Sequence, residues 1–265
     1  MFLHFVGRPM ESSPVRKRGI SCFRSHEVNR TCRRRSTEVS ERPLVVLACR
    51  VLEDLLGPRL DASTRITYLD FGLHDRPSEM PPALQERLDA IPEPSTVIVG
   101  YGLCGNGVVG VESGPHTLVF PRTHDCVGMM LGSRQRYAEE FAAEPGTYYL
   151  TRGWLESGDD PRTDHYSLVE DYGVERGERL TDTMYGSYRK LRLVAFSQEE
   201  LAAVRPMAAP VAEFCRDRWG FDYDEYIGDP GLIERLARAD PTGDTTDLLV
   251  VPPGTTVTQM MFLAD

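Results

Sequence analysis

The chain has 265 residues, of which 41% are hydrophobic, and this is enough apolar material for one large domain or two smaller ones. Its net charge is −10 but is unevenly spread: residues 1–43 hold ten basic and four acidic side chains, a net of +6, so the remainder carries −16. A body this acidic is a poor candidate for binding nucleic acid. No apolar run reaches the roughly 18 residues that a membrane span requires.

Residues 1–43 show neither helical nor strand periodicity, and their basic side chains are mixed with Ser, Glu and Thr. The apolar block at residues 1–7 is too short for a secretory signal. We expect this segment to be a disordered basic arm or a non-native upstream extension. Without an export signal we expect a cytoplasmic protein, whose thiols are free or bound to metal.

Short apolar runs bounded by Gly and Pro predict strands, and the amphipathic stretches between them predict helices. The predicted strands, in chain order, are residues 44–48, 66–69, 96–99, 117–120, 147–150, 190–196, 221–226 and 247–251. The predicted helices are residues 51–56, 81–91, 126–143, 165–188, 198–218 and 230–238. We expect Asp125 to cap the third helix, and Pro206 and Pro210 to interrupt the fifth.

This alternation predicts an α/β fold, with a mainly parallel sheet or sheets, helices on both faces and Rossmann-like layers. Residues 44–160 are expected to form one α/β lobe and residues 161–265 a second lobe packed on it around a cleft. One continuous domain is the alternative.

Three of the predicted strands run into loops that carry a cysteine. Cys49 follows the first, Cys104 lies in the glycine loop after the third, and Cys126 follows His124 in the loop after the fourth. Ligands of such sheets bind outside the carboxyl ends of the strands, so we expect these side chains to face one crevice.

Thiolate and imidazole are ligands of zinc, and a catalytic zinc keeps one position open. We therefore predict a metal site formed by Cys49, Cys104 and Cys126, with His124 as fourth ligand or nearby base. Zinc is the preferred ion, and an iron–sulfur cluster held by three cysteines is the alternative. No C-x-x-C motif is present. The alternative to a shared metal site is that the three cysteines are buried separately and do not contact one another.

An activated thiol is a second hypothesis for the same residues. Cys126 is expected in the first turn of a helix, where the helix dipole favours the thiolate, and His124 is its candidate base. Glu53 and Arg122 are further catalytic candidates, because near the crevice they would orient ligands or bind a carboxylate.

The glycine loop formally matches G-x-G-x-x-G, but it lacks the helix that dinucleotide binding requires. Its backbone amides remain candidates for cradling an anionic group. This assigns a cofactor-binding role to Gly102, Gly105, Asn106 and Gly107. Tyr148, Tyr149 and Trp154 are expected to pack in the core, and Cys215 to be buried in a helix.

Several blocks of the sequence together resemble one prokaryotic family. The blocks are VLACRVLEDLL, YGLCGNGVVGV, PRTHDCVGMMLGSRQRY, PGTYYLTRGWLE and DLLVVPPG. The chain resembles the family called domain of unknown function 1638 over residues 44–257. Arg50 departs from the small residue expected there, which would alter the edge of the crevice.

The resemblance implies a context more than an activity, since such proteins often appear beside corrinoid-dependent methyl-transfer systems in anaerobes. The His124-Asp125-Cys126 pair of ligands is also similar to the His-x-Cys pair of zinc methyltransferases that methylate a thiol, although the ligand order differs. We therefore expect a metal-dependent, transferase-like enzyme of one-carbon metabolism acting on a small molecule. The partner implied is a corrinoid or methyl-transfer protein. The alternative is a non-catalytic accessory protein that binds metal or corrinoid.

Overall fold

The structure is a computed structural model that describes residues 42–73, 76–239 and 246–263. Of the arm expected over residues 1–43, residues 1–41 lie outside the described part of the chain. All the described residues belong to one compact unit, residues 41–265.

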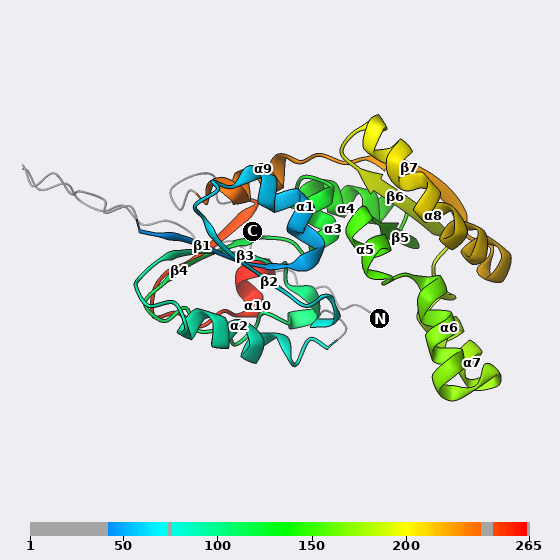
Figure 1. Cartoon of the computed structure of the whole chain (residues 1–265), viewed down its shortest axis with the longest axis horizontal. Coiled ribbons are helices and arrows are strands. Elements are labelled where there is room, and N and C mark those ends of the chain that lie inside the picture. The colour runs from blue at the N-terminus through cyan, green and yellow to red at the C-terminus, as the bar shows by residue number, and fades with distance from the viewer. Residues whose placement is uncertain (1–41, 74–75, 240–245, 264–265) are drawn as a thin grey trace, which may run out of the picture. The chain divides into compact units, whose positions relative to one another are not determined.

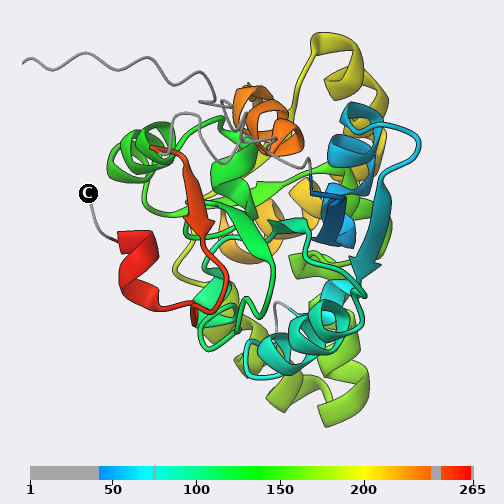
Figure 2. The ribbon, with the colours of Figure 1, turned by 90° about the vertical axis from the view of Figure 1, so that its left-hand side faces the viewer.

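Within the described residues, eight strands form two sheets (Figure 1). The first sheet has the order β2-β1-β3-β4-β8, and the second has the order β5-β6-β7. The strands are β1 (Leu44–Cys49), β2 (Arg65–Leu69), β3 (Thr96–Gly100), β4 (Thr117–Pro121), β5 (Thr147–Leu150), β6 (Lys190–Ala195), β7 (Asp222–Ile227) and β8 (Leu248–Val251). All neighbours are parallel except β8, which runs antiparallel to β4 (Figure 2). The prediction of a mainly parallel α/β fold is confirmed.

The centre of the first sheet consists of β1, β3 and β4, whose residues are nearly all buried. Helices cover both faces of a parallel sheet, so its central strands need apolar side chains in both directions. In Figure 1, α2 (Met80–Asp89) and α10 (Gln259–Leu263) lie on one side of the sheet, and α1 (Glu53–Leu56) and α9 (Gly231–Arg238) lie on the other. This explains why the strand signal in the sequence is a continuous apolar run.

The second sheet is packed by α8 (Gln198–Trp219), which contacts β6 and β7. Leu191, Leu193 and Ala195 of β6 belong to the core with α8, whereas Val194 belongs to the core of the first sheet. Successive side chains of β6 point to opposite faces of the strand, so β6 contributes to both cores. The remaining helices are α3 (Cys126–Met130), α4 (Arg134–Ala143), α5 (Arg152–Ser157), α6 (Pro161–Tyr172) and α7 (Val174–Tyr185).

Three helix predictions are corrected by the structure. The helix expected over 126–143 is two helices, because Gly132 adopts φ +92° and Ser133 caps α4. The helix expected over 165–188 begins at Pro161 and is a hairpin of α6 and α7, which turns at Gly173 with φ +79°. Both turns place glycine in the left-handed region, which side chains disfavour.

The third correction concerns α8, which runs without a break through Pro206 and Pro210. Each proline removes one backbone donor, so the carbonyl four residues earlier loses its partner. Both prolines and Ala202 are exposed, so the orphaned carbonyls are on the hydrated side of the helix. Solvent can therefore supply the hydrogen bonds that the helix lacks at these positions.

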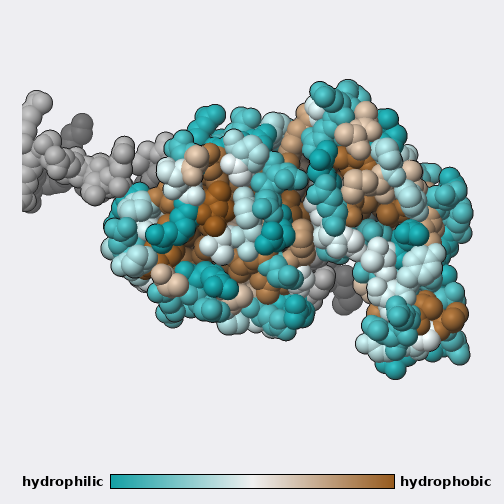
Figure 3. Space-filling view, viewed as in Figure 1, coloured by the Kyte–Doolittle hydropathy of each residue, from teal (hydrophilic) through white to brown (hydrophobic). Residues whose placement is uncertain are grey.

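The two sheets do not divide the chain at residue 160. β5 precedes that position and pairs with β6 of the second sheet, and β8 returns from the C-terminal part to pair with β4. The chain therefore crosses between the sheets more than once. Hydrophilic side chains predominate on the face seen in Figure 3. No helix among the described residues has the length and apolar character of a membrane span.

Candidate functional site

The three cysteine loops meet at one edge of the first sheet. β1, β3 and β4 are adjacent and parallel, and they end at Cys49, Gly100 and Pro121. The carboxyl ends of parallel neighbours share an edge, so the loops that follow them are close in space.

The glycine loop is fixed to the loop that precedes α3 by backbone hydrogen bonds. The Leu103 amide donates to the Thr123 carbonyl at 2.9 Å, and the Cys104 amide donates to the His124 carbonyl at 2.7 Å. Cys104, Gly105 and Asn106 have φ values of +45°, +64° and +72°. Two of these are not glycine, and such backbone strain is concentrated at functional sites.

Cys126 begins α3, as the sequence predicted from its capping residue. The Asp125 carboxylate accepts from the amides of Val127 at 3.0 Å and Gly128 at 3.3 Å. Its other oxygen accepts from the Tyr137 hydroxyl at 3.1 Å. This network holds the first turn of α3, and with it Cys126, against α4.

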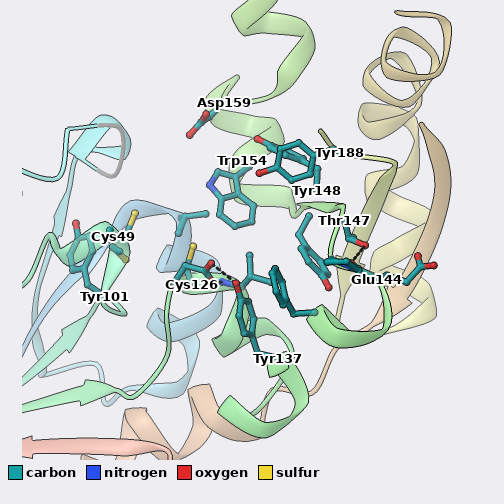
Figure 4. Close-up of a pocket in the computed structure, with 18 of the residues that line it drawn as sticks. Cys49, Tyr101, Cys126, Tyr137, Glu144, Thr147, Tyr148, Trp154, Asp159 and Tyr188 are labelled. Atoms are coloured by element: carbon teal, nitrogen blue, oxygen red, sulfur yellow. Dashed lines mark hydrogen bonds between the residues drawn. The ribbon is translucent and has the colours of Figure 1, made fainter. Parts of the chain in front are cut away.

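Cys49, Cys104 and Cys126 line one pocket, which we name the thiol pocket (Figure 4). Its volume is about 420 Å³, within the range of small-molecule sites. The thiols and Tyr101 form one side. Figure 4 shows Trp154 and Tyr137 between the labelled thiols Cys49 and Cys126 and the pair Tyr148 and Tyr188. The aromatic side chains beyond the thiols are Tyr137, Phe141, Tyr148, Tyr149, Trp154 and Tyr188.

Burial in this environment favours the protonated form of all three thiols. Burial raises the pKa of Cys104 to about 12, and the charges of Asp125 and Cys49 contribute to this rise. Burial and the neighbouring Cys104 also raise the pKa of Cys126, and burial raises the pKa of Cys49. Since the thiolate is the reactive form, these cysteines need a partner that removes the proton.

The hydroxyl of Tyr101 is a second feature of this wall. Tyr101 is only 2% exposed, and its hydroxyl lies near the Cys49 thiol without forming a well-aligned hydrogen bond among the described residues. A buried hydroxyl without a well-formed hydrogen bond is uncommon, and in many proteins a bound ligand or an ordered water supplies that bond.

The thiols share a pocket, yet they do not form a coordination sphere. Among the described residues, no group of three or more His, Cys, Asp or Glu side chains is arranged to hold a metal ion. The three sulfurs are the soft donors that zinc and iron–sulfur clusters use. Metal binding would therefore require the side chains to turn from the positions they have here.

Three other predicted residues lie away from the thiol pocket. His124 is exposed and stacks on Tyr137, with ring centroids 6.0 Å apart. Arg122 lies beside His124, and Glu53 is exposed and pairs with Arg50 at 3.1 Å. The structure thus brings together the three cysteines and leaves the candidate base, His124, outside their pocket.

The predicted anion-binding residues of the glycine loop have different surroundings. Gly102 packs on Thr123 and Gly107 packs on Met80, each closely enough that a Cβ would clash. Asn106 is exposed, and only Gly105 lines the thiol pocket. The close approach of two chain segments accounts for Gly102 and Gly107.

Sequence reasoning missed the aromatic side of the pocket. Tyr148, Tyr149 and Trp154 pack against the two hydrophobic cores, as expected, and the structure shows that they also line the pocket. The signal available in the sequence was the high frequency of aromatic residues, since five of them occur from position 137 to position 154. That frequency alone does not distinguish a core from a pocket.

Fold and site together define a mixed α/β protein with a thiol-lined pocket beside its parallel sheet. The family model described as protein of unknown function (DUF1638) matches residues 68–237. This is more than half of the chain, so the chain belongs to that family, as the resemblance predicted. The match includes Cys104 and Cys126 and begins after Cys49. Neither a curated protein nor a solved structure matches the chain significantly.

Proposed function

We propose that the thiol pocket is the active site of a metal-dependent enzyme of small-molecule metabolism, and that Cys49, Cys104 and Cys126 bind its metal ion. The observation that carries the proposal is the convergence of three thiols, from three separate strand ends, on one pocket of small-molecule size. Zinc is the preferred ion, with an iron–sulfur cluster as the alternative.

The surroundings of the thiols favour a metal over a thiol that reacts alone. No His, Lys or Arg is among the described residues that line the pocket, so neither an imidazole nor an amine is placed there to deprotonate a cysteine. A bound metal ion would lower the pKa of the thiols, so that their protons are released to water on binding. The hypothesis that His124 activates Cys126 is the weaker one, because His124 lies outside the pocket.

The role of the metal would be to activate a substrate thiol or a water molecule. The Tyr101 hydroxyl, buried in the same wall, is available to donate a hydrogen bond to a bound group. Transfer of a one-carbon or methyl group, with a corrinoid or methyl-transfer protein as partner, is the reaction class we propose from the family resemblance.

A non-catalytic accessory protein that holds metal or corrinoid is the second candidate. The same lack of a lining His, Lys or Arg among the described residues favours it, since a carrier needs no proton transfer. The two candidates differ in access to the metal. An enzyme keeps a coordination position open for substrate, and a carrier with a closed site does not.

The test is elemental analysis and absorption spectroscopy of the full chain, purified without oxygen. We expect about one metal ion or cluster per chain, lost in the Cys49→Ser, Cys104→Ser, Cys126→Ser triple variant. Cys215→Ser is the matched control, because Cys215 is buried in α8, outside the pocket. Metal retained in full by the triple variant contradicts the proposal.

Access is measured on the cobalt-substituted protein. Addition of a small thiol changes its absorption if a coordination position is open, which supports the enzyme. An unchanged spectrum in a protein that binds cobalt stoichiometrically supports the carrier.

A further inference from the structure

The charged side chains that line the thiol pocket, among the described residues, are all acidic. Asp125, Glu144 and Asp159 are the carboxylates among its lining residues, and no Lys, Arg or His is found with them in the described part of the chain. An anionic ligand would therefore meet repulsion and no cationic partner.

The three carboxylates reach the pocket from different elements of the fold. Asp125 caps α3, and Glu144 forms an ion pair with Lys190. Asp159 is close enough to both sides of the pocket to act electrostatically on the Cys49 thiol and on the Tyr148 hydroxyl. Asp159 therefore contributes negative charge to the pocket from its lining.

Arg192 is a basic side chain behind the aromatic wall, and its charge acts on Tyr149. It does not supply a free cation to the pocket. Both oxygens of Asp224 accept from it at 2.7 Å, and Glu140 accepts from its other end, also at 2.7 Å.

The aromatic rings of the pocket stand in two groups. Tyr137 and Phe141, one turn apart on α4, are stacked with centroids 6.4 Å apart and planes inclined by 12°. Tyr148 and Tyr188 meet edge to face, with centroids 5.4 Å apart. Ring faces carry negative potential, and aromatic cages of this composition attract organic cations, quaternary ammonium groups above all.

We propose that the thiol pocket binds a methylated organic cation, a quaternary ammonium or sulfonium compound, with the aromatic rings around the cationic centre and Asp159 as counter-charge. Such a cation is apolar on its surface, so it loses little hydration on entering an aromatic pocket. A metal ion on the thiols and a cation among the rings would occupy different parts of the pocket. The proposal rests on the proposed function only in treating this pocket as the ligand site.

The test is calorimetric titration of the reduced, metal-free full chain with choline as probe. The comparison ligand is 3,3-dimethylbutan-1-ol, which has the same shape and no charge, and acetate is the anionic comparison. We expect saturable binding of choline at least about ten-fold tighter than that of the alcohol, and none of acetate.

Variants locate the binding. Asp159→Asn keeps the volume and removes the charge, and we expect it to weaken choline about ten-fold while the alcohol changes little. Tyr149→Leu should weaken choline at least about five-fold, and Tyr149→Phe should not, because it keeps the ring. Tyr172→Leu is the matched control, since Tyr172 lies on α6 outside the pocket.

Equal affinity for choline and the alcohol would overturn the proposal, as would binding of acetate or no saturable binding of choline. Loss of choline binding in the control variant Tyr172→Leu, with binding kept in the pocket variants, would also overturn it. If Tyr149→Leu fails to fold, Asp159→Asn decides the matter. Choline bound by a wild-type chain that takes up no metal would retain this inference and refute the metal proposal, so the two fail separately.

Discussion

Gly102→Ala tests whether the two cysteine loops are positioned by direct contact with each other. A Cβ at Gly102 would lie 2.8 Å from both the carbonyl and the hydroxyl oxygen of Thr123, and 3.0 Å from the amide nitrogen of Asp125. Thr123 is 3% exposed, and its hydroxyl donates to the Asp125 carbonyl at 2.8 Å. The second loop therefore has no free volume into which it can retreat.

The expected cost follows from these contacts. Overpacking of a buried position costs about 1–3 kcal/mol. Separation of the loops also lengthens the hydrogen bonds from the Leu103 and Cys104 amides, each with a net value of about 1 kcal/mol. We expect the free energy of unfolding to fall by about 2–4 kcal/mol, and the thermal midpoint by roughly 5–15 °C in a unit of this size.

The assay is urea unfolding followed by circular dichroism, together with metal uptake by the folded protein. Gly146→Ala is the matched control, because its Cβ would meet neighbours only at 3.4–3.5 Å, an ordinary contact distance. Its free energy of unfolding should stay within about 0.5 kcal/mol of wild type. Metal affinity should fall in Gly102→Ala, which displaces Cys104, and not in the control. Equal midpoints for both variants would refute the reasoning.

Two further predictions concern the thiols and the second sheet. In the metal-free protein, alkylation of Cys104 by iodoacetamide should be about three orders of magnitude slower at pH 8 than that of a free thiol, because its pKa is raised to about 12. The rate should rise about ten-fold per pH unit toward pH 11, and rapid labelling at pH 8 would contradict this. Arg192→Met removes the bonds from β6 to Asp224 and Glu140, and should lower the free energy of unfolding by about 2–3 kcal/mol in urea titration. The expected loss is smaller than for a fully buried ion pair, because Asp224 retains its ion pair with Lys190 at 3.2 Å. An unchanged unfolding midpoint would show that the network has no net effect on stability.

The strands were predictable because each has a local cause. β1, β3 and β4 are covered on both faces, so each must be apolar along its whole length. Asp125 was predictable as a cap because its side chain bonds amides only two and three residues away. Such interactions depend on neighbours in the chain, and a pattern of a few residues contains them.

The helix breaks were less predictable. Gly132 and Gly173 end helices by adopting positive φ, while Pro206 and Pro210 remain inside one. Glycine tolerates both helical and left-handed backbone, and an exposed carbonyl finds water, so neither residue type decides the outcome by itself. The packing of the neighbouring elements does.

For the candidate site, the sequence alone determined that three thiols follow three strands. It also determined that those strands are of the kind that pair in a parallel sheet, which gives their ends a common edge. Only the tertiary structure decided that β1, β3 and β4 are neighbours, that His124 lies outside the pocket, and that residues 137–154 supply the opposite wall. The reason is physical: a strand end or a cap is set by local backbone and side-chain geometry. Whether an aromatic ring fills a core or lines a cavity depends on which distant parts of the chain lie beside it. Tyr148 shares its pocket with Cys104 and Cys49, which lie far from it in the sequence.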